Sequence, residues 1–174
     1  FFAGVLFNWA DLSITLLAFF SLSFISSVGY IINDLIDLEK DRLHPEKRSR
    51  ALASGRVLKG VAGIFGAVLL LFGFAIAAFI SLSFVYILVF FFGLSLLYTF
   101  WLKKIIFADV IAISLFFVAR AVAGAIAINV YISPWLILCP FFLALFLAIG
   151  KRHSDLLLLK DKAFIRPDEQ SVKV

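Results

Sequence analysis

The chain has 174 residues, of which 64% are hydrophobic, and its mean hydropathy is +1.11. Soluble domains of this length are nearer half apolar, so the composition excludes an ordinary soluble protein and indicates that lipid surrounds much of the chain. The single cysteine, Cys139, excludes an internal disulfide and a thiolate metal site. The net charge of +5 does not indicate a nucleic-acid partner, because the basic residues follow a pattern typical of membrane proteins.

Five apolar stretches are long enough to cross a membrane as helices, which takes about 20 residues. In chain order they are residues 12–32, 57–79, 84–102, 105–128 and 134–150. Transmembrane strands need only about 10 residues and alternate in polarity, so helices are favoured. The connections at 81–83 and 129–133 are short, which makes consecutive helices antiparallel neighbours. The sequence therefore predicts an all-α, polytopic transmembrane helix bundle.

The charged residues gather on one side of this predicted bundle. If the spans alternate in direction, the segments 33–56, 103–104 and 151–174 fall on the same side of the membrane. Together with Lys59 they hold every Lys and Arg except Arg120. Cytoplasmic loops carry such an excess of basic residues, so this side is predicted to face the cytoplasm.

An acidic motif, N-D-L-I-D-L-E-K-D, begins where the first span meets water. If the helix continues past Ile32, Asp34, Asp37 and Asp41 lie on one of its faces, because they are three and seven residues apart. Three carboxylates on one face repel one another unless a cation neutralises them. Carboxylates combined with substrate phosphates suit Mg²⁺, so these acids are predicted metal ligands and catalytic residues. The amide of Asn33 could orient a ligand beside them.

A basic run follows the acids directly. Its members are Arg42, His44, Lys47, Arg48 and Arg50. Cations beside a metal-carboxylate cluster can bind and neutralise a diphosphate, which makes this run a predicted substrate-binding segment. The alternative is a solvated patch at the membrane surface, in which the acids simply pair with the basic residues.

These motifs resemble the first signature of the UbiA prenyltransferase superfamily. The resemblance is carried by N-D-x-x-D-x-x-x-D from Asn33 and by R-x-L-A-S-G from Arg50. Residues 41–50, D-R-L-H-P-E-K-R-S-R, are more similar to one branch, the decaprenyl-phosphate phosphoribosyltransferases. Ala51 departs from the superfamily pattern, which commonly has Pro there, and this change concerns the shape of the loop rather than the chemistry.

The resemblance implies a bundle of nine helices, of which about five are present. A chain without Met that opens on Phe1 is accordingly expected to be a fragment of a single membrane domain. In this interpretation, residues 33–56 form a cytoplasmic catalytic loop, and residues 151–174 hold a second polar motif and a truncated tail.

The second polar motif is K-R-H-S-D at the end of the fifth span. By itself it is equally well explained as a basic helix-end anchor with a local pair between Lys151 and Asp155. The superfamily places its second motif at this point, commonly as D-x-x-x-D, and the phosphoribosyl branch has a version rich in Lys and Arg. The resemblance thus implies that Lys151 and Arg152 contact phosphate and that Asp155 is a metal or ribose ligand.

Polar residues between the two motifs are further candidates for substrate binding. Tyr98 lies near the charged-side end of the third span, and Lys103 lies in the turn that follows that span. Arg120 lies about four turns inside its span, where an ionisable residue is a functional candidate by default. It either pairs with an acid within the bundle or contacts a lipid phosphate.

The resemblance implies Mg²⁺-dependent transfer of 5-phosphoribosyl from phosphoribosyl diphosphate to a polyprenyl phosphate, in cell-wall or glycolipid precursor synthesis at a bacterial plasma membrane. One alternative is a prenyltransferase that alkylates an aromatic or other acceptor with a polyprenyl diphosphate. A second is a non-catalytic transporter or scaffold. Chain length of the lipid and oligomeric state are left open.

Overall fold

The computed structural model describes residues 8–45 and 47–165, with the backbone alone for Ile106, Arg152, His153 and residues 155–165. This part of the chain is helical and contains no β-strand. The α-helices are α1 (Trp9–Ile36), α2 (Leu38–Leu43), α3 (Lys59–Ile80), α4 (Leu82–Phe100), α5 (Ile106–Ala127) and α6 (Pro134–Ile165), and the two 3-10 turns are η1 (Lys47–Ser49) and η2 (Leu102–Lys104). The predicted all-α fold class is confirmed.

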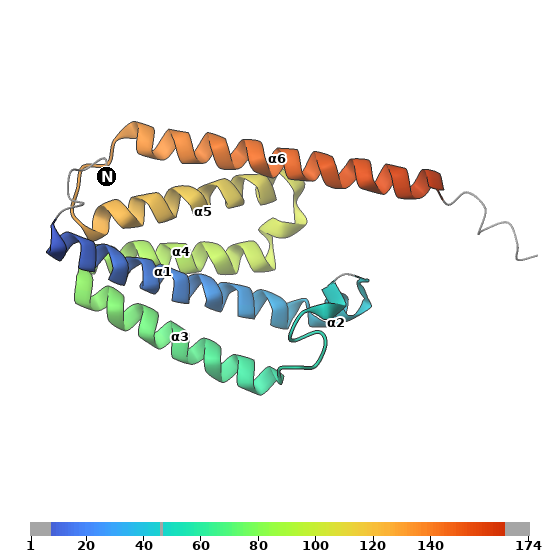
Figure 1. The fold of residues 1–174 in the computed structure, drawn as a ribbon, viewed down its shortest axis with the longest axis horizontal. Helices are drawn as coiled ribbons and strands as arrows, with labels where there is room; N and C mark the ends of the chain where they lie inside the picture. The colour runs from blue at the N-terminus through green and yellow to red at the C-terminus, as the bar shows by residue number, and fades with distance from the viewer. Residues whose placement is uncertain (1–7, 46, 166–174) are drawn as a thin grey trace, which may run out of the picture.

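Five of these helices are long and apolar enough to cross a membrane, which agrees with the five predicted spans. They lie side by side and alternate in direction (Figure 1). The short helix α2, the turn between α4 and α5 and the later part of α6 all lie at the same end of the bundle (Figure 1). The described parts of the three charged segments therefore meet at one end, as the alternation of spans predicts.

Local polar contacts fix where two of the long helices begin. The Asn8 side chain accepts a hydrogen bond from the Ala10 N–H at 3.1 Å and caps α1. The Ser81 hydroxyl accepts one from the Phe84 N–H at 3.1 Å and caps α4. Such caps satisfy N–H groups that have no partner inside the helix, which lets α3 turn into α4 within one residue.

A close approach between α1 and α3 anchors the core. The Ser21 hydroxyl, fully buried in α1, donates a hydrogen bond to the Gly73 carbonyl in α3 at 2.8 Å. A Cβ at Gly73 would lie 2.9 Å from Ile25 Cδ1, so only glycine allows this spacing without movement. The core extends from Ile25 to Phe84 and Phe91 in α4, which are also buried.

Two helices extend further than predicted. Helix α1 continues to Ile36, so the acidic motif begins inside the helix rather than in a loop, and α2 folds the part of the motif after Asp37 into a short helical turn. Helix α6 continues to Ile165, well past the predicted end at Gly150 (Figure 1). No Pro or Gly interrupts residues 151–165, so nothing in this segment breaks the helix when the chain leaves the apolar region.

Candidate active site

The acidic motif is held by a bend between α1 and α2 at Asp37. The Asp37 N–H donates to the Asn33 carbonyl at 2.9 Å, and the Asp41 N–H donates to the Asp37 carbonyl at 2.8 Å. The helical spacing of hydrogen bonds thus continues across the bend, although Asp37 itself leaves helical geometry (ψ 4°). Asp34, Asp37 and Asp41 consequently occupy successive turns at the charged end of the bundle.

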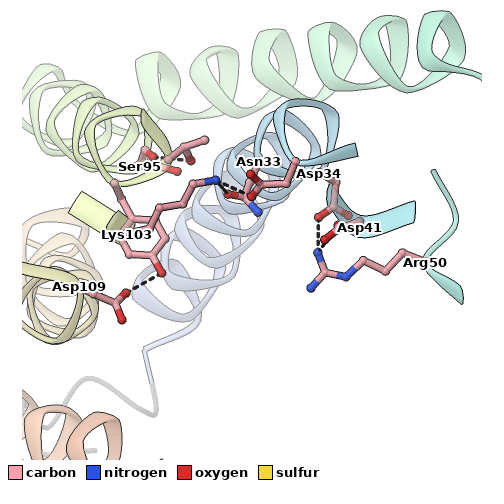
Figure 2. Close-up of polar contacts among 10 residues, drawn as sticks. Asn33, Asp34, Asp41, Arg50, Ser95, Lys103 and Asp109 are labelled. Atoms are coloured by element: carbon pink, nitrogen blue, oxygen red, sulfur yellow. Dashed lines mark hydrogen bonds and ion pairs between the residues drawn. The ribbon is translucent and has the colours of Figure 1, made fainter. Parts of the chain in front are cut away.

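Arg50 joins two of the three acids. Its Nη1 atom donates to Asp34 Oδ1 at 3.0 Å and to Asp41 Oδ2 at 2.9 Å, as Figure 2 shows. The Asp41 side chain is only 6% exposed, whereas that of Arg50 is 40% exposed. A buried carboxylate needs a positive partner, and the guanidinium reaches it from the solvent side. One nitrogen therefore holds two carboxylates from two helices at a single point.

Lys103 binds Asp37, the acid of the motif that Arg50 does not contact. Its ammonium donates to Asn33 Oδ1 at 2.9 Å and to Asp37 Oδ2 at 2.5 Å (Figure 2). The side chains of Lys103 and Asp37 are each 18% exposed, so water screens this ion pair poorly. The contact ties the turn after α4 to the end of α1.

A close approach of α1 and α4 sets up this contact. A Cβ on Gly29 would collide with the Ser95 hydroxyl, so the missing side chain allows the two helices to meet. Gly29 lies one turn before Asn33, and Ser95 lies two turns before Lys103. The glycine thus brings the acids of α1 within reach of a lysine from a distant part of the chain.

A cavity of about 570 Å³ opens beside these residues. Its walls combine carboxylate and amide groups from α1, cations from several segments, and aromatic rings from α4 and α5. The polar side chains among them that were predicted from the sequence are Asn33, Asp34, Lys47, Arg50, Tyr98, Arg120 and Lys151. The structure therefore gathers seven predicted residues, far apart in the sequence, around one space.

The wall on the side of α4 and α5 is built around Tyr98. Its hydroxyl donates to Asp109 Oδ1 at 2.9 Å, and its ring packs edge-to-face against Phe116 with centroids 5.8 Å apart. Phe116 in turn packs against Phe91 at 5.4 Å. Tyr98 is thus oriented at both ends, which holds α4 against α5 beside the cavity.

A family model for the UbiA prenyltransferase family matches residues 1–157. The chain belongs to the UbiA prenyltransferase family. This places the acidic motif and its cavity in a family of membrane proteins, in agreement with the five helices that are long and apolar enough to span.

Named relatives of this UbiA-family chain support the same assignment. It is 32% identical over 155 residues to the decaprenyl-phosphate phosphoribosyltransferase of Mycolicibacterium smegmatis, with 88% of this chain and 49% of the relative covered. It is 34% identical over 158 residues to the protein of the same name from Corynebacterium glutamicum, with 90% and 48% covered. The digeranylgeranylglyceryl phosphate synthase of Methanocaldococcus jannaschii is 39% identical over 72 residues, which is 41% of this chain and 25% of that one. The chain spans about half the length of the phosphoribosyltransferases it matches.

The donor set suits Mg²⁺ in part. Among the described residues, no three His, Cys, Asp or Glu side chains gather as a metal-binding group, because Asp37 turns to Lys103 while Asp34 and Asp41 share Arg50. Arg50 Nη1 lies between the carboxylates of Asp34 and Asp41, at a point where the same two groups could bind a metal cation instead. Two carboxylates completed by water and substrate phosphates are a common set of Mg²⁺ ligands. The structure thus differs from a simple cluster of three acids and fits a metal held jointly with substrate.

Four described residues of the predicted substrate-binding set lie outside the cavity wall, namely Lys103, which pairs with Asp37, and three residues of the basic run. Arg42 pairs with Glu39 at 3.4 Å on the exposed side of α2, and His44 Nδ1 accepts a hydrogen bond from the Lys47 N–H at 3.4 Å within the turn. Arg48 is exposed on η1. The side chains of Arg152 and Asp155 lie outside the described residues, although their backbone belongs to α6.

The structure also adds polar wall residues that the sequence analysis did not identify. They are Ser26, Tyr30, Ser95 and Thr99. Ser95, Tyr98 and Thr99 are three and four residues apart, so they share one face of α4 and interrupt an otherwise apolar span. That spacing could have identified these residues from the sequence. It does not stand out, because Ser and Thr are common in membrane helices, where their hydroxyls bond to the backbone. Thr99 shows this habit, since its hydroxyl donates to the Ser95 carbonyl at 2.9 Å.

Proposed function

We propose that this UbiA-family protein transfers the 5-phosphoribosyl group of phosphoribosyl diphosphate to a polyprenyl phosphate such as decaprenyl phosphate. The observation that carries the proposal is the convergence of carboxylates and cations at the charged end of one cavity. Asp34, Arg50, Lys47 and Lys151 all line that cavity. A soluble sugar diphosphate needs both kinds of group, and three relatives named decaprenyl-phosphate phosphoribosyltransferase match most of the chain.

Donor binding begins at the acids of α1 and α2. Asp34 and Asp41 would hold Mg²⁺ together with the diphosphate, and the metal would supply neutralisation of the charge that grows on the leaving group. Arg50, no longer needed by the two carboxylates, would turn its guanidinium to phosphate oxygens, for which its planar fork is well suited. Lys47 and Lys151 would bind the remaining charge from the cavity wall.

Lys103 has a different task in this proposal. Its short contacts to Asp37 and Asn33 fix the end of α1 relative to α4. An ammonium held by two acceptors is pre-oriented, so little reorganisation accompanies the reaction. Lys103 therefore positions the acidic motif and adds positive potential beside the leaving group.

The transfer itself is a substitution at the anomeric carbon of the ribose. An oxygen of the polyprenyl phosphate forms the new bond to this carbon. The bond from the carbon to the diphosphate oxygen breaks, and its electron pair leaves with pyrophosphate. The products are pyrophosphate and a lipid in which phosphate links the polyprenyl chain to phosphoribose, so atoms and charge balance without an oxidant or reductant.

The attacking group needs no strong general base. A phosphate monoester is anionic at neutral pH and already carries its nucleophilic oxygen. This agrees with the position of His44, which is exposed on the turn before η1 and not in the cavity wall. Catalysis in this proposal comes from positioning and from cations around the departing pyrophosphate.

The proposed site faces the cytoplasm of a bacterial plasma membrane. The support is the gathering of basic segments at one end of the bundle (Figure 1), to which the cavity residues Asp34, Arg50 and Lys151 also belong. A water-soluble donor would enter from that end, while the lipid acceptor would come from the bilayer. The product would be a precursor for cell-wall or other glycolipid synthesis.

A transfer assay tests the proposal. The intact protein, reconstituted in phospholipid nanodiscs, is supplied with Mg²⁺, labelled phosphoribosyl diphosphate and polyprenyl phosphate. We expect label in the lipid fraction, loss of at least about a hundredfold in Asp34→Asn, and near wild-type transfer in Glu39→Gln, an exposed acid of the same motif. Label from polyprenyl diphosphate on an aromatic acceptor instead would establish prenyl transfer, and no transfer of either kind would favour a transporter or scaffold.

A further inference from the structure

Arg120 is a charged residue deep in a membrane-spanning helix. It lies 14 residues after the start of α5, which corresponds to roughly 21 Å along a helix axis. Among the described side chains, no carboxylate forms a salt bridge with it. Its recorded contacts are the rings of Phe91 at 5.6 Å and Phe117 at 5.9 Å, and a long hydrogen bond of 3.5 Å to the Ser26 hydroxyl. These contacts orient the guanidinium but do not neutralise it.

The guanidinium leans toward the charged end of the bundle. Helical side chains tilt toward the N-terminus of their helix, and α5 begins at the charged end (Figure 1). Phe117, whose ring lies under the guanidinium, is one turn nearer that end. Arg120 therefore contributes to the wall of the polar cavity that also contains Asp34 and Arg50.

A second cavity meets the first at Arg120. It has a volume of about 480 Å³ and lies between α1 and α5. Both cavities are lined by Ser26 and Arg120. The walls of the second are mainly apolar and include Ala18, Phe19 and Leu22 from one face of α1. Besides Ser26 and Arg120, its polar side chains are two hydroxyls, that of Ser23 and that of Thr15, which donates to the Asp11 carbonyl.

The molecule that matches this junction has one anionic head and a long apolar tail. An arginine without a carboxylate partner attracts phosphate, and its fork geometry suits phosphate oxygens. An apolar groove suits isoprenoid chain and offers nothing to a soluble sugar phosphate. Because the two features meet at one residue, a ligand that used both would be held with its phosphate toward the polar cavity and its tail in the groove.

We propose that Arg120 binds the phosphate of the lipid acceptor and that the first isoprene units lie in the groove between α1 and α5. This deepens the proposed function and rests on it for the identity of the acceptor. Ser26 lies eight residues before Asp34 in α1, or roughly 12 Å along the axis. A ribose ring with its phosphate bonds can bridge such a separation, so donor and acceptor would meet between Arg120 and the acidic motif.

Kinetics of Arg120 variants test which substrate this residue serves. We expect Arg120→Gln to raise the KM for polyprenyl phosphate about tenfold or more, while the KM for phosphoribosyl diphosphate changes less than about twofold. Arg120→Lys should recover part of the loss, since lysine keeps the positive charge but lacks the paired N–H donors of the guanidinium. Arg56→Gln, at an exposed arginine of the α2–α3 connection, is the matched control. A rise confined to the KM of the soluble donor would overturn the proposal.

A second pair of variants tests the groove. A Cβ on Gly124, which lines the groove in α5, would meet nothing within 4 Å, so this position has room for the first atom of a new side chain. Gly124→Leu should therefore raise the KM for polyprenyl phosphate at least about fivefold. Gly63→Leu, at an equally open position on α3, should not. Equal effects of the two substitutions would contradict the proposed position of the tail.

Binding without turnover separates this inference from the proposed reaction. Nanodisc-embedded protein is mixed with polyprenyl phosphate or with uncharged polyprenol, in the absence of donor, and bound lipid is quantified by native mass spectrometry. We expect wild type to prefer the phosphate at least about tenfold and Arg120→Gln to lose that preference. If the preference is present but no phosphoribosyl is transferred, the proposed reaction fails and the lipid-phosphate site stands. If wild type binds both lipids equally, the site itself is wrong.

Discussion

Lys103 and Asp37 form an ion pair with a nitrogen-to-oxygen distance of 2.5 Å, although 66 positions separate them in the sequence. The same ammonium also holds Asn33. One lysine in the turn after α4 therefore fixes the last turn of α1, where the acidic motif begins. The rigidity of the candidate site depends on a residue outside the motif that gives it its chemical character.

Loss of Lys103 should weaken both the structure of the site and its activity. In Lys103→Ala, Asp37 keeps its burial but loses its cation, so we expect kcat/KM for phosphoribosyl diphosphate to fall at least about tenfold. Lys104→Ala removes an exposed charge from the same turn and is the control. Steady-state transfer rates measured for both variants provide the comparison, and similar losses in the two would indicate a general effect of charge at this end.

Arg50→Gln should make the folded protein more dependent on Mg²⁺. Without the guanidinium, Asp34 and Asp41 face each other uncompensated, and unfolding becomes easier by roughly 1–3 kcal/mol. Added Mg²⁺ should then raise the thermal unfolding midpoint of the variant more than that of wild type, where Arg50 competes for the same oxygens. Thermal melts of nanodisc-embedded protein with and without Mg²⁺ measure this difference. An identical Mg²⁺ response in both proteins would argue against a metal between these acids.

Tyr98→Phe should lower stability modestly. The substitution removes the hydrogen bond to Asp109 but keeps the ring against Phe116, so the expected loss is roughly 0.5–1.5 kcal/mol in the free energy of unfolding. Tyr86→Phe, at a tyrosine of α4 that is 66% exposed, should leave stability unchanged. Thermal or denaturant unfolding followed by tryptophan fluorescence compares the two variants.

Gly73→Ala should destabilise the bundle, because the new methyl group would lie 2.9 Å from Ile25 Cδ1 and 3.4 Å from the Ser21 carbonyl oxygen. Overpacking of this kind costs roughly 1–3 kcal/mol. Gly63→Ala in the same helix meets no neighbour and should stabilise by up to about 1 kcal/mol, since alanine favours helix more than glycine does. Unfolding midpoints that move in the same direction for both variants would show that α1 and α3 do not pack as described.

Hydropathy and charge predicted the fold well. The five apolar stretches have the length of membrane-spanning helices, and the structure has five such helices. Because consecutive helices alternate in direction, the segments 33–56 and 103–104 and the segment that begins at Lys151 lie at one end. The gathering of Asp34, Arg50 and Lys151 at one cavity follows from that alternation, because each lies at the charged end of a span or in the connection that follows it.

The detailed pairing at the site could not be predicted in the same way. Spacing alone placed three acids on one face of a helix, but the bend at Asp37 and the reach of Lys103 direct the third acid elsewhere. Such a contact depends on how closely α1 approaches α4, and this is decided by Gly29 opposite Ser95. The distance between α1 and α4 results from how their side chains pack, so it cannot be predicted from the residue pattern of either helix alone.

The double contact of Arg50 has a consequence for how ligands bind. Mg²⁺ alone would release the guanidinium without giving it a new anion, and diphosphate alone would meet Asp34 and Asp41 with their negative charge restored. Each ligand therefore removes an obstacle to the other, which is positive cooperativity between two binding events. The apparent affinity for phosphoribosyl diphosphate should rise with Mg²⁺. The apparent affinity for Mg²⁺ should rise by the same factor with the donor. The ligand-free protein should therefore bind either ligand weakly when the other is absent.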